Sequence, residues 1–319
     1  MRRSFYISLL ITGALFAMAN IGVAFLGRNS VPRQIARRIE TTPGLNCLAL
    51  GNSLMEAGFH APTFEAASRN RHAAMIAVNA GMGSSYPVEH LLFLRRAFQK
   101  GRDLECVMYG FFDLQLMEYP RTKVQELIGN RAMLYYFEPD LAVKYYQWPL
   151  WERLGFHAAR MLPVIEERGA IWAKVEKIRR RLGDLGMPRQ QTNRFGRTMD
   201  FTLLEAPDPA AFARECDRAV DTRRELSKPV LDMIGLARQH GSRISMIEMP
   251  MSPAHVANYY NTPSWQRYRA YLRDLLESHG AGYVVAGDWI TDERLFEDRL
   301  HLSAEGSISF SQKLAMAAL

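Results

Sequence analysis

The chain is poor in cysteine and lacks the patterns that hold a structural metal or bind nucleic acid. Its 319 residues include only three cysteines, Cys47, Cys106 and Cys216, whose spacing fits neither a disulfide framework nor a zinc site. Cys47 and Cys106 lie in apolar runs, where we expect buried thiols. The net charge of +7 is moderate, and no basic low-complexity tail is present. The sequence therefore predicts no metal, no cofactor and no nucleic-acid partner.

Charge is also missing near the N-terminus. Arg2 and Arg3 are followed by an uncharged, mostly apolar stretch from Ser4 to Gly27. As a helix, this stretch can span about 30 Å of hydrocarbon. An A-x-A pattern at residues 17–19 leaves a cleavable signal peptide as the alternative. Because the apolar run continues past that pattern, we expect an uncleaved transmembrane helix over residues 4–27.

Strand-like apolar runs alternate with helical patterns in two parts of the chain. The strand-like runs cover residues 45–50, 73–81, 104–110, 242–250 and 281–288, and the helical patterns cover 52–70, 86–101, 264–280 and 303–319. This alternation predicts an α/β fold with a parallel sheet covered on both faces. Ligands of such sheets bind beyond the carboxyl ends of the strands. Functional residues are therefore expected just after each run.

The alternation stops between residues 114 and 207, where the sequence is helix-rich, aromatic and basic. We interpret this part as a large helical insertion. It is either a solvated cap or a lid, membrane-surface or polysaccharide platform that uses Tyr135, Tyr136, Tyr145, Tyr146, Trp148 and Trp151. The predicted organisation is an anchor at 1–29, a linker at 30–44, a core formed by 45–113 and 208–319, and the insertion at 114–207.

Ser53 follows the first strand-like run in the stretch Gly51-Asn52-Ser53 and precedes a helical pattern. A serine hydroxyl needs a base to accept its proton and donors to stabilise the oxyanion that its attack creates. A helix N-terminus supplies free N–H groups and the positive end of the helix dipole. Taken alone, the position fits an N-cap serine at least as well as a nucleophile.

Asp298 and His301 form a D-x-x-H pattern just before the last helical segment. A carboxylate three residues before a histidine can hydrogen-bond the imidazole ring, which fixes its tautomer and stabilises the imidazolium. The other ring nitrogen is then free to face a serine. The alternative interpretation is a surface turn followed by the capping residue Ser303.

Together, GNSL at 51–54 and DRLH at 298–301 resemble the outer motif blocks of the SGNH/GDSL hydrolase family, in which GDSL is the commoner first block. The resemblance covers roughly residues 45–115 and 242–319. It implies a three-layer, flavodoxin-like fold and a catalytic triad of Ser53 as nucleophile, His301 as general base and Asp298 as its orienting partner.

The inner blocks of the family match less closely. The second block supplies a backbone oxyanion donor, which here falls at Gly83 or Ser84. The N–H of Ser53 is expected as a further backbone donor. The third block, G-x-N-D, reads Gly110-Phe111-Phe112-Asp113, so that Phe112 replaces the asparagine whose side chain donates to the oxyanion. We expect Asn79 or Tyr109 to substitute as a donor. Tyr109, Asp113 and Met251 are also expected to contact substrate.

An anchor, an SGNH-like core and a large insertion resemble the membrane-anchored members of this family that act in O-acylation of envelope polysaccharides. The resemblance implies a serine esterase or O-acyltransferase in the bacterial inner membrane, with its catalytic domain outside the cytoplasm. The expected substrate is an acyl ester, with acetyl as the expected acyl group, or a glycan, and the expected partner is a multipass membrane-bound O-acyltransferase. The alternative, suggested by Phe112, is a non-catalytic scaffold that binds polysaccharide.

Overall fold

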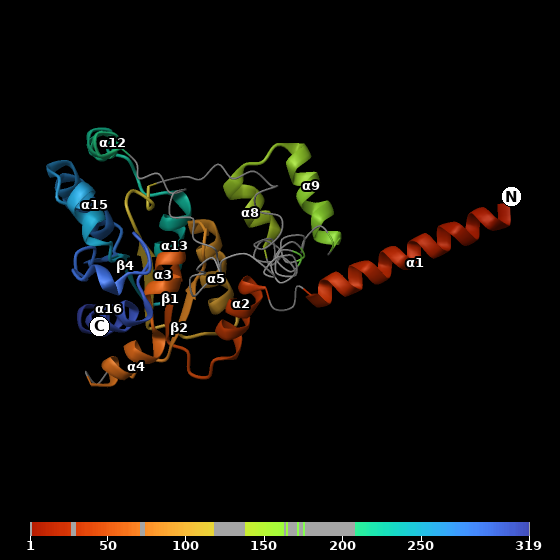
Figure 1. The fold of residues 1–319 in the computed structure, drawn as a ribbon, viewed down its shortest axis with the longest axis horizontal. Helices are drawn as coiled ribbons and strands as arrows, with labels where there is room; N and C mark the ends of the chain where they lie inside the picture. Colours follow the sequence, from red (N-terminus) through yellow and green to blue (C-terminus); the bar gives the residue numbers. More distant parts are fainter. Residues whose placement is uncertain are drawn as a thin grey trace, which may run out of the picture. The chain divides into compact units, whose positions relative to one another are not determined.

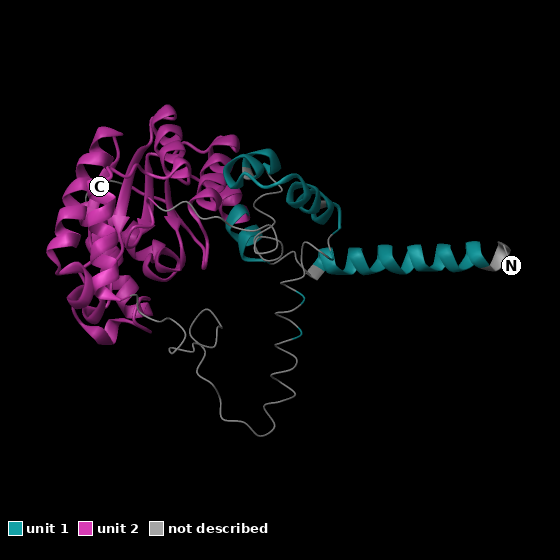
Figure 2. Cartoon of the chain, turned by 90° about the horizontal axis from the view of Figure 1, so that it is seen from above, with its two compact units in different colours: residues 1–36, 120–190 teal, residues 37–119, 191–319 magenta. Residues whose placement is uncertain are grey.

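The computed structural model describes residues 2–26, 30–70, 74–117, 138–162, 164, 171, 175 and 208–318. The chain divides into two compact units, one formed by residues 1–36 and 120–190 and the other by 37–119 and 191–319 (Figure 2). Tyr135, Tyr136 and most of the predicted insertion after residue 162 lie outside the described residues. The anchor, linker and insertion boundaries drawn from the sequence are a finer division and remain a prediction.

The larger unit contains a five-stranded sheet in the order β2-β1-β3-β4-β5 (Figure 1). The strands are β1 (Cys47–Gly51), β2 (Ala77–Gly81), β3 (Cys106–Phe111), β4 (Arg243–Glu248) and β5 (Gly282–Val285). Every neighbouring pair is parallel. This strand order is the flavodoxin-like one, and the predicted α/β fold with a parallel sheet is confirmed. The buried, free thiols expected at Cys47 and Cys106 are also confirmed, and they face each other across β1 and β3.

Helices cover both faces of the sheet. On one face lie α3 (Ser53–Gly58), α4 (Ala61–Arg69) and α16 (Ala304–Ala317), which pack against one another. Helices α5 (Pro87–Gln99) and α13 (Lys228–Gln239) pack together on the other face. Successive residues of β3 point to opposite faces of the sheet. Tyr109 contacts His90 of α5 on one face, and Gly110 abuts Met55 of α3 on the other.

The other described helices of this unit surround these layers. They are α12 (Pro209–Asp221), α14 (Pro253–His255), a π-helical turn at Val256–Tyr260, α15 (Pro263–Ser278) and a 3-10 turn at Glu293–Leu295. Helix α2 (Val31–Thr41) joins the two units along the chain. It was expected as a linker or short helix.

Three glycines form a row at the carboxyl end of the sheet, where Gly51 is in register with Gly81 on one side and Gly110 on the other. A Cβ atom at Gly81 would lie 2.3 Å from the backbone nitrogen of Glu56. A Cβ at Gly110 would lie 2.7 Å from the side chain of Met55, and Gly51 also has a φ of +151° that favours glycine. Helix α3 therefore rests directly on the backbone of three strands.

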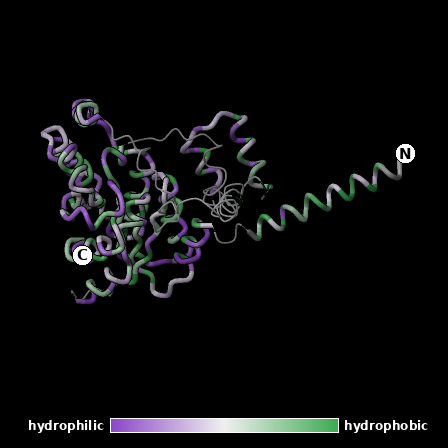
Figure 3. Tube along the Cα trace, viewed as in Figure 1, coloured by the Kyte–Doolittle hydropathy of each residue, from purple (hydrophilic) through white to green (hydrophobic). Residues whose placement is uncertain are grey.

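The smaller unit contains α1 (Arg2–Leu26), α8 (Pro139–Tyr146) and α9 (Leu150–Met161). The segment Phe5–Phe25 of α1 is long and apolar enough to cross a membrane (Figure 3). None of this segment is buried. Trp148 stacks on Tyr146 and contacts Phe156 of α9. Tyr145 and Trp148 are buried, so the prediction that they belong to an exposed aromatic platform is wrong. Trp151 remains exposed.

We predict that Gly81→Ala destabilises the protein by about 2 kcal/mol or more, because the added methyl group meets the backbone of α3 rather than a movable side chain. The matched control is Gly235→Ala in the exposed middle of α13, where nothing lies within 4 Å of the new Cβ. That change should stabilise the chain by about 0.5–1 kcal/mol. Urea denaturation of both variants measures the difference, and equal effects would contradict the packing described here.

Candidate functional site

Ser53 lies at the junction of β1 and α3. Asn52 is the N-cap of α3, and its Oδ1 atom accepts a hydrogen bond of 2.8 Å from the N–H of Leu54. Ser53 is the first residue of the helix, so the interpretation of Ser53 as the N-cap is wrong. Since Asn52 caps the helix, the hydroxyl of Ser53 is not needed for capping and is available for another partner.

That partner is His301, which is 248 residues away in sequence. The Nε2 atom of His301 lies 2.8 Å from the Oγ atom of Ser53. The Nδ1 atom of the same ring lies 2.7 Å from Oδ2 of Asp298. The three side chains thus form one continuous chain of hydrogen bonds in the order that acyl transfer requires.

The D-x-x-H segment forms a tight turn just before α16. The Oδ1 atom of Asp298 accepts hydrogen bonds of 2.7 Å from the N–H groups of both Leu300 and His301. Ser303 then caps α16 by accepting a bond from the N–H of Gly306. One carboxylate oxygen therefore holds the backbone of the turn while the other orients the imidazole. Both alternatives weighed for this segment, the turn and the orienting pair, are present together.

The environment of Asp298 keeps its carboxylate ionised. The side chain is 4% exposed, and burial by itself raises the pKa of a carboxyl group. The hydrogen bond and positive charge offered by His301, together with the two backbone N–H groups, outweigh burial and lower the pKa of Asp298 below its usual value. The group therefore remains an anion that can stabilise an imidazolium on His301.

Three of the predicted oxyanion donors are backbone N–H groups near the hydrogen-bonded Ser53, His301 and Asp298. Among the residues that the structure describes, the N–H groups of Ser53, Gly83 and Ser84 donate to no protein acceptor. Gly83 and Ser84 lie in the turn after β2, where Ser84 has a left-handed φ of 56°. The geometry leaves all three free to donate, and their role as oxyanion donors remains a prediction.

The turn after β2 is held by a buried relay of polar side chains. The Oγ atom of Ser85 lies 2.6 Å from Nε2 of His90, whose Nδ1 lies 3.0 Å from the hydroxyl of Tyr109. Ser85 also bonds the carbonyl oxygen of Met82. Tyr109 is fully buried, and burial raises its pKa. The prediction of Tyr109 as a substrate contact or oxyanion donor is therefore wrong, because its hydroxyl instead contacts His90, which holds the turn after β2.

The side chain of Asn79 also makes structural hydrogen bonds. Its Nδ2 atom lies 2.7 Å from the carbonyl oxygen of Phe59 and within 3.2 Å of the carbonyls of Met55 and Glu56. Its Oδ1 accepts a 2.9 Å bond from the N–H of Gly81. An amide has two N–H donors, and both are occupied at the far end of α3. The prediction that Asn79 supplies an oxyanion donor is wrong.

Asp113 lies at the end of β3 with a left-handed φ of 48°. Its Oδ1 atom accepts a 3.0 Å hydrogen bond from the hydroxyl of Tyr260 and lies 3.2 Å from Nε2 of the buried His255. The carboxylate thus fixes the loop after β3 to the segment after β4, which corrects its expected role as a substrate contact. Met251 is fully buried, so its predicted place in an open substrate pocket is wrong.

His255 and Tyr260 did not emerge from the sequence as site residues. They lie 142 and 147 residues from Asp113, His255 at the end of α14 and Tyr260 at the end of the π-helical turn, and no motif marks either element. The only sequence signal was their position shortly after the fourth strand-like run, at the edge where ligands bind.

Gln115 was likewise missed, and it lies against the nucleophile's neighbour. The Nδ2 atom of Asn52 donates a 3.2 Å hydrogen bond to Oε1 of Gln115. Within the described part of the chain, the Nε2 group of Gln115 has no acceptor. An uncommitted amide donor therefore lies beside the junction of β1 and α3, two residues beyond the third motif block.

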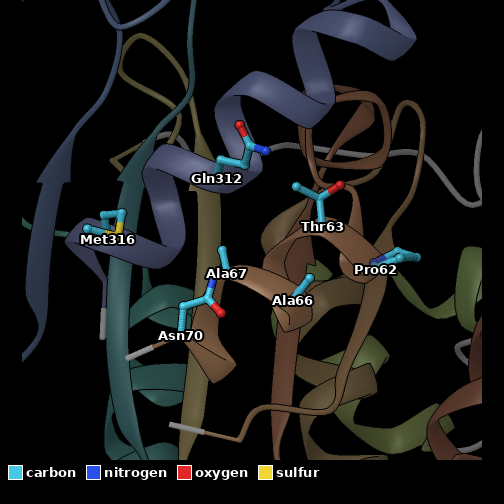
Figure 4. A pocket seen from close by; sticks show the side chains of 7 residues that line it. All are labelled: Pro62, Thr63, Ala66, Ala67, Asn70, Gln312 and Met316. Atoms are coloured by element: carbon cyan, nitrogen blue, oxygen red, sulfur yellow. The ribbon is translucent and has the colours of Figure 1, made fainter. Parts of the chain in front are cut away.

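A surface groove of about 470 Å³ lies between α4 and α16, and none of these site residues lines it (Figure 4). It is lined by Pro62, Thr63, Ala66, Ala67, Asn70, Gln312 and Met316. None of these side chains is ionisable, so we assign the groove no role in catalysis. Among the described residues, no group of three or more His, Cys, Asp or Glu is arranged to hold a metal ion.

No family model matches the chain, and no curated protein matches it. A solved structure from Bacteroides fragilis NCTC 9343, described as a putative acylhydrolase, is similar over 89% of this chain and 93% of that chain. The sequence identity is 10% and the TM-score is 0.39. Because both values are low, we base neither the fold nor the function of this chain on that similarity.

We predict that the stabilising effect of Asp298 is lost in acid. Its pKa is lower in the folded than in the unfolded chain. The carboxylate therefore stabilises the fold above its unfolded pKa of about 4, and this contribution disappears as pH falls through the folded pKa. The free energy of unfolding of Asp298→Asn should approach that of the parent as pH falls from 5.5 to 3. A gap that widens over this range would contradict the assigned environment.

Proposed function

We propose that this protein is a membrane-anchored SGNH-type serine esterase or O-acyltransferase. The proposal is carried by one observation, the continuous chain of hydrogen bonds from Ser53 through His301 to Asp298. The resemblance of GNSL and DRLH to the family's outer blocks, and the flavodoxin-like strand order, support the same conclusion.

In the proposed reaction, the Oγ atom of Ser53 bonds to the carbonyl carbon of an acyl ester while its proton passes to Nε2 of His301. The negative charge on Asp298 stabilises the imidazolium. When the tetrahedral oxyanion collapses, the bond to the alcohol oxygen breaks and that oxygen takes the proton from His301. An acyl-serine remains on the enzyme.

A second hydroxyl then completes the cycle. Water or a sugar hydroxyl gives its proton to His301 and attacks the acyl-serine, and the Oγ atom of Ser53 leaves with that proton. Water yields hydrolysis, and a sugar hydroxyl yields O-acyl transfer. The outcome depends on which acceptor the site positions and whether water is excluded. We propose a glycan of the cell envelope as the acyl donor or acceptor, on the architecture of anchor, core and insertion.

The oxyanion requires donors, and Phe112 cannot provide the side-chain donor of the third motif block. We propose that the Nε2 group of Gln115 fills this role, together with the N–H groups of Ser53 and of Gly83 or Ser84. The support is the hydrogen bond from Asn52 to Oε1 of Gln115, which holds the amide against the residue next to the nucleophile, and within the described residues its N–H₂ group has no acceptor.

The membrane setting of the proposal follows from α1, which is long and apolar enough to cross a bilayer. We propose a single-pass protein of the bacterial inner membrane whose catalytic unit lies outside the cytoplasm, beside a multipass membrane-bound O-acyltransferase. Such a partner would supply acyl groups from the cytoplasmic side. A non-catalytic, polysaccharide-binding scaffold is favoured only by Phe112. This alternative does not account for the hydrogen-bonded arrangement of Ser53, His301 and Asp298.

We predict that Ser53→Ala abolishes turnover of p-nitrophenyl acetate and labelling by a fluorophosphonate, because both need the nucleophilic oxygen. The fold should be retained, since Asn52 rather than Ser53 caps α3. The matched control is Ser278→Ala, an exposed serine at the end of α15, which should keep both activities. Full turnover or labelling in Ser53→Ala would refute the assignment, and absence of labelling in the parent would favour the scaffold.

We predict that Gln115→Ala lowers kcat by about 10²–10³ and leaves KM nearly unchanged, because an oxyanion donor acts mainly in the transition state. The cap of α3 should persist, since Asn52 bonds Leu54 through a different atom. Steady-state kinetics with p-nitrophenyl acetate measure the split, with the exposed Gln312→Ala as control. An unchanged kcat would assign the oxyanion to other donors.

A further inference from the structure

Helix α9 has an apolar face that is exposed in the described part of the protein. Leu150, Trp151, Leu154 and Met161 are 58%, 80%, 50% and 81% exposed, respectively. At 3.6 residues per turn, these four side chains fall within an arc about 100° wide. Large apolar side chains gathered on one exposed helix face mark an interaction surface. We refer to these four residues as the α9 apolar face.

This face is distinct from the one by which α9 packs within the protein. Phe156 and Ala159 are fully buried, and the ring of Phe156 lies 5.0 Å from that of Trp148. These two residues fall on the side of the helix away from Leu154. The α9 apolar face is therefore an additional surface, not a core face left open.

A hydrogen bond fixes the chain just beyond α9 at a defined position along α1. The N–H of Val164, three residues beyond Met161, donates a 3.1 Å bond to Oδ1 of Asn20. Asn20 lies five residues before Phe25, where the apolar segment of α1 ends. Five residues of helix correspond to about 7.5 Å. Amphipathic helices lie about 5–10 Å deep in the boundary between headgroups and acyl chains, so the two depths coincide.

We propose that α9 lies in the surface of the same bilayer that α1 crosses, with the α9 apolar face inserted among the lipids. Tryptophan is favoured at this depth, which suits Trp151. Arg153 is exposed beside the apolar arc, where it can reach anionic headgroups. The inference depends on the membrane anchoring included in the proposed function and adds a second, interfacial contact. Its effect is to hold the smaller unit against the membrane.

The test uses spin labels on the full chain in nanodiscs of phosphatidylethanolamine and phosphatidylglycerol. The native cysteines, Cys47, Cys106 and Cys216, are all buried, so an introduced surface cysteine is labelled selectively. Labels at Leu154→Cys and Met161→Cys should favour oxygen over a water-soluble nickel chelate. Chelate accessibility should be at least about threefold lower than at Arg153→Cys, which is exposed on the same helix outside the apolar arc.

A label at Leu15→Cys, in the middle of the apolar segment of α1, separates this inference from the anchoring on which it depends. If Leu15 is in the bilayer but Leu154 and Met161 are as accessible to the chelate as Arg153, the interfacial helix is refuted and the anchor stands. If both α9 labels are shielded from oxygen and chelate alike, protein rather than lipid covers the face, and the proposal is again overturned. A chelate-accessible Leu15 would refute the anchor as well.

Discussion

The close approach of α3 to the end of the sheet is the contact on which the rest of the site depends. It is possible because three neighbouring strands end in glycine at the same level, Gly81, Gly51 and Gly110. A single methyl group in this row would meet backbone atoms or Met55. If α3 moved outward by about 1 Å, the 2.8 Å contact between Ser53 and His301 would be lost, and misplacements of that size can cost 10²-fold in rate.

Buried and partly buried polar side chains then fix the loops around this contact. Asn79 ties the end of α3 to β2, and the relay from Ser85 through His90 holds the turn after β2. Asp113 joins the loop after β3 to His255. Each of these groups is satisfied by protein partners, so moving it would leave a buried polar atom unpaired at a cost of about 1–3 kcal/mol. The candidate catalytic side chains lie at the carboxyl edge of the sheet, and the polar side chains that hold the surrounding loops lie behind them.

The fold class and the pairing of Asp298 with His301 could be predicted because both follow from local patterns. Apolar runs reveal strands, and D-x-x-H places a carboxylate and an imidazole on one turn. The pairing of Ser53 with His301, 248 residues apart, was expected only from the resemblance of GNSL and DRLH to the outer SGNH/GDSL blocks. The predictions for Tyr109 and Asn79 failed because a side chain's direction depends on which face of the sheet it occupies and on what packs there. Met251 lies beyond the end of β4, and its burial depends on packing that the sequence does not show. Only the folded chain shows that Tyr109 points toward α5 and away from the site. His255 was missed because its partner lies 142 residues away.

The two departures from the family's motifs, Asn52 and Phe112, acquire a common explanation when considered with Gln115. An aspartate at position 52 would only accept hydrogen bonds, so a neighbouring glutamine would turn its N–H₂ group toward the carboxylate. Asn52 instead donates through Nδ2 to Oε1 of Gln115, which forces the N–H₂ group of the glutamine to face elsewhere. An asparagine at position 52 therefore turns toward other partners an amide donor that has no acceptor among the described residues. The loss of the donor at Phe112 and the replacement of aspartate by asparagine compensate for each other in the proposed oxyanion site.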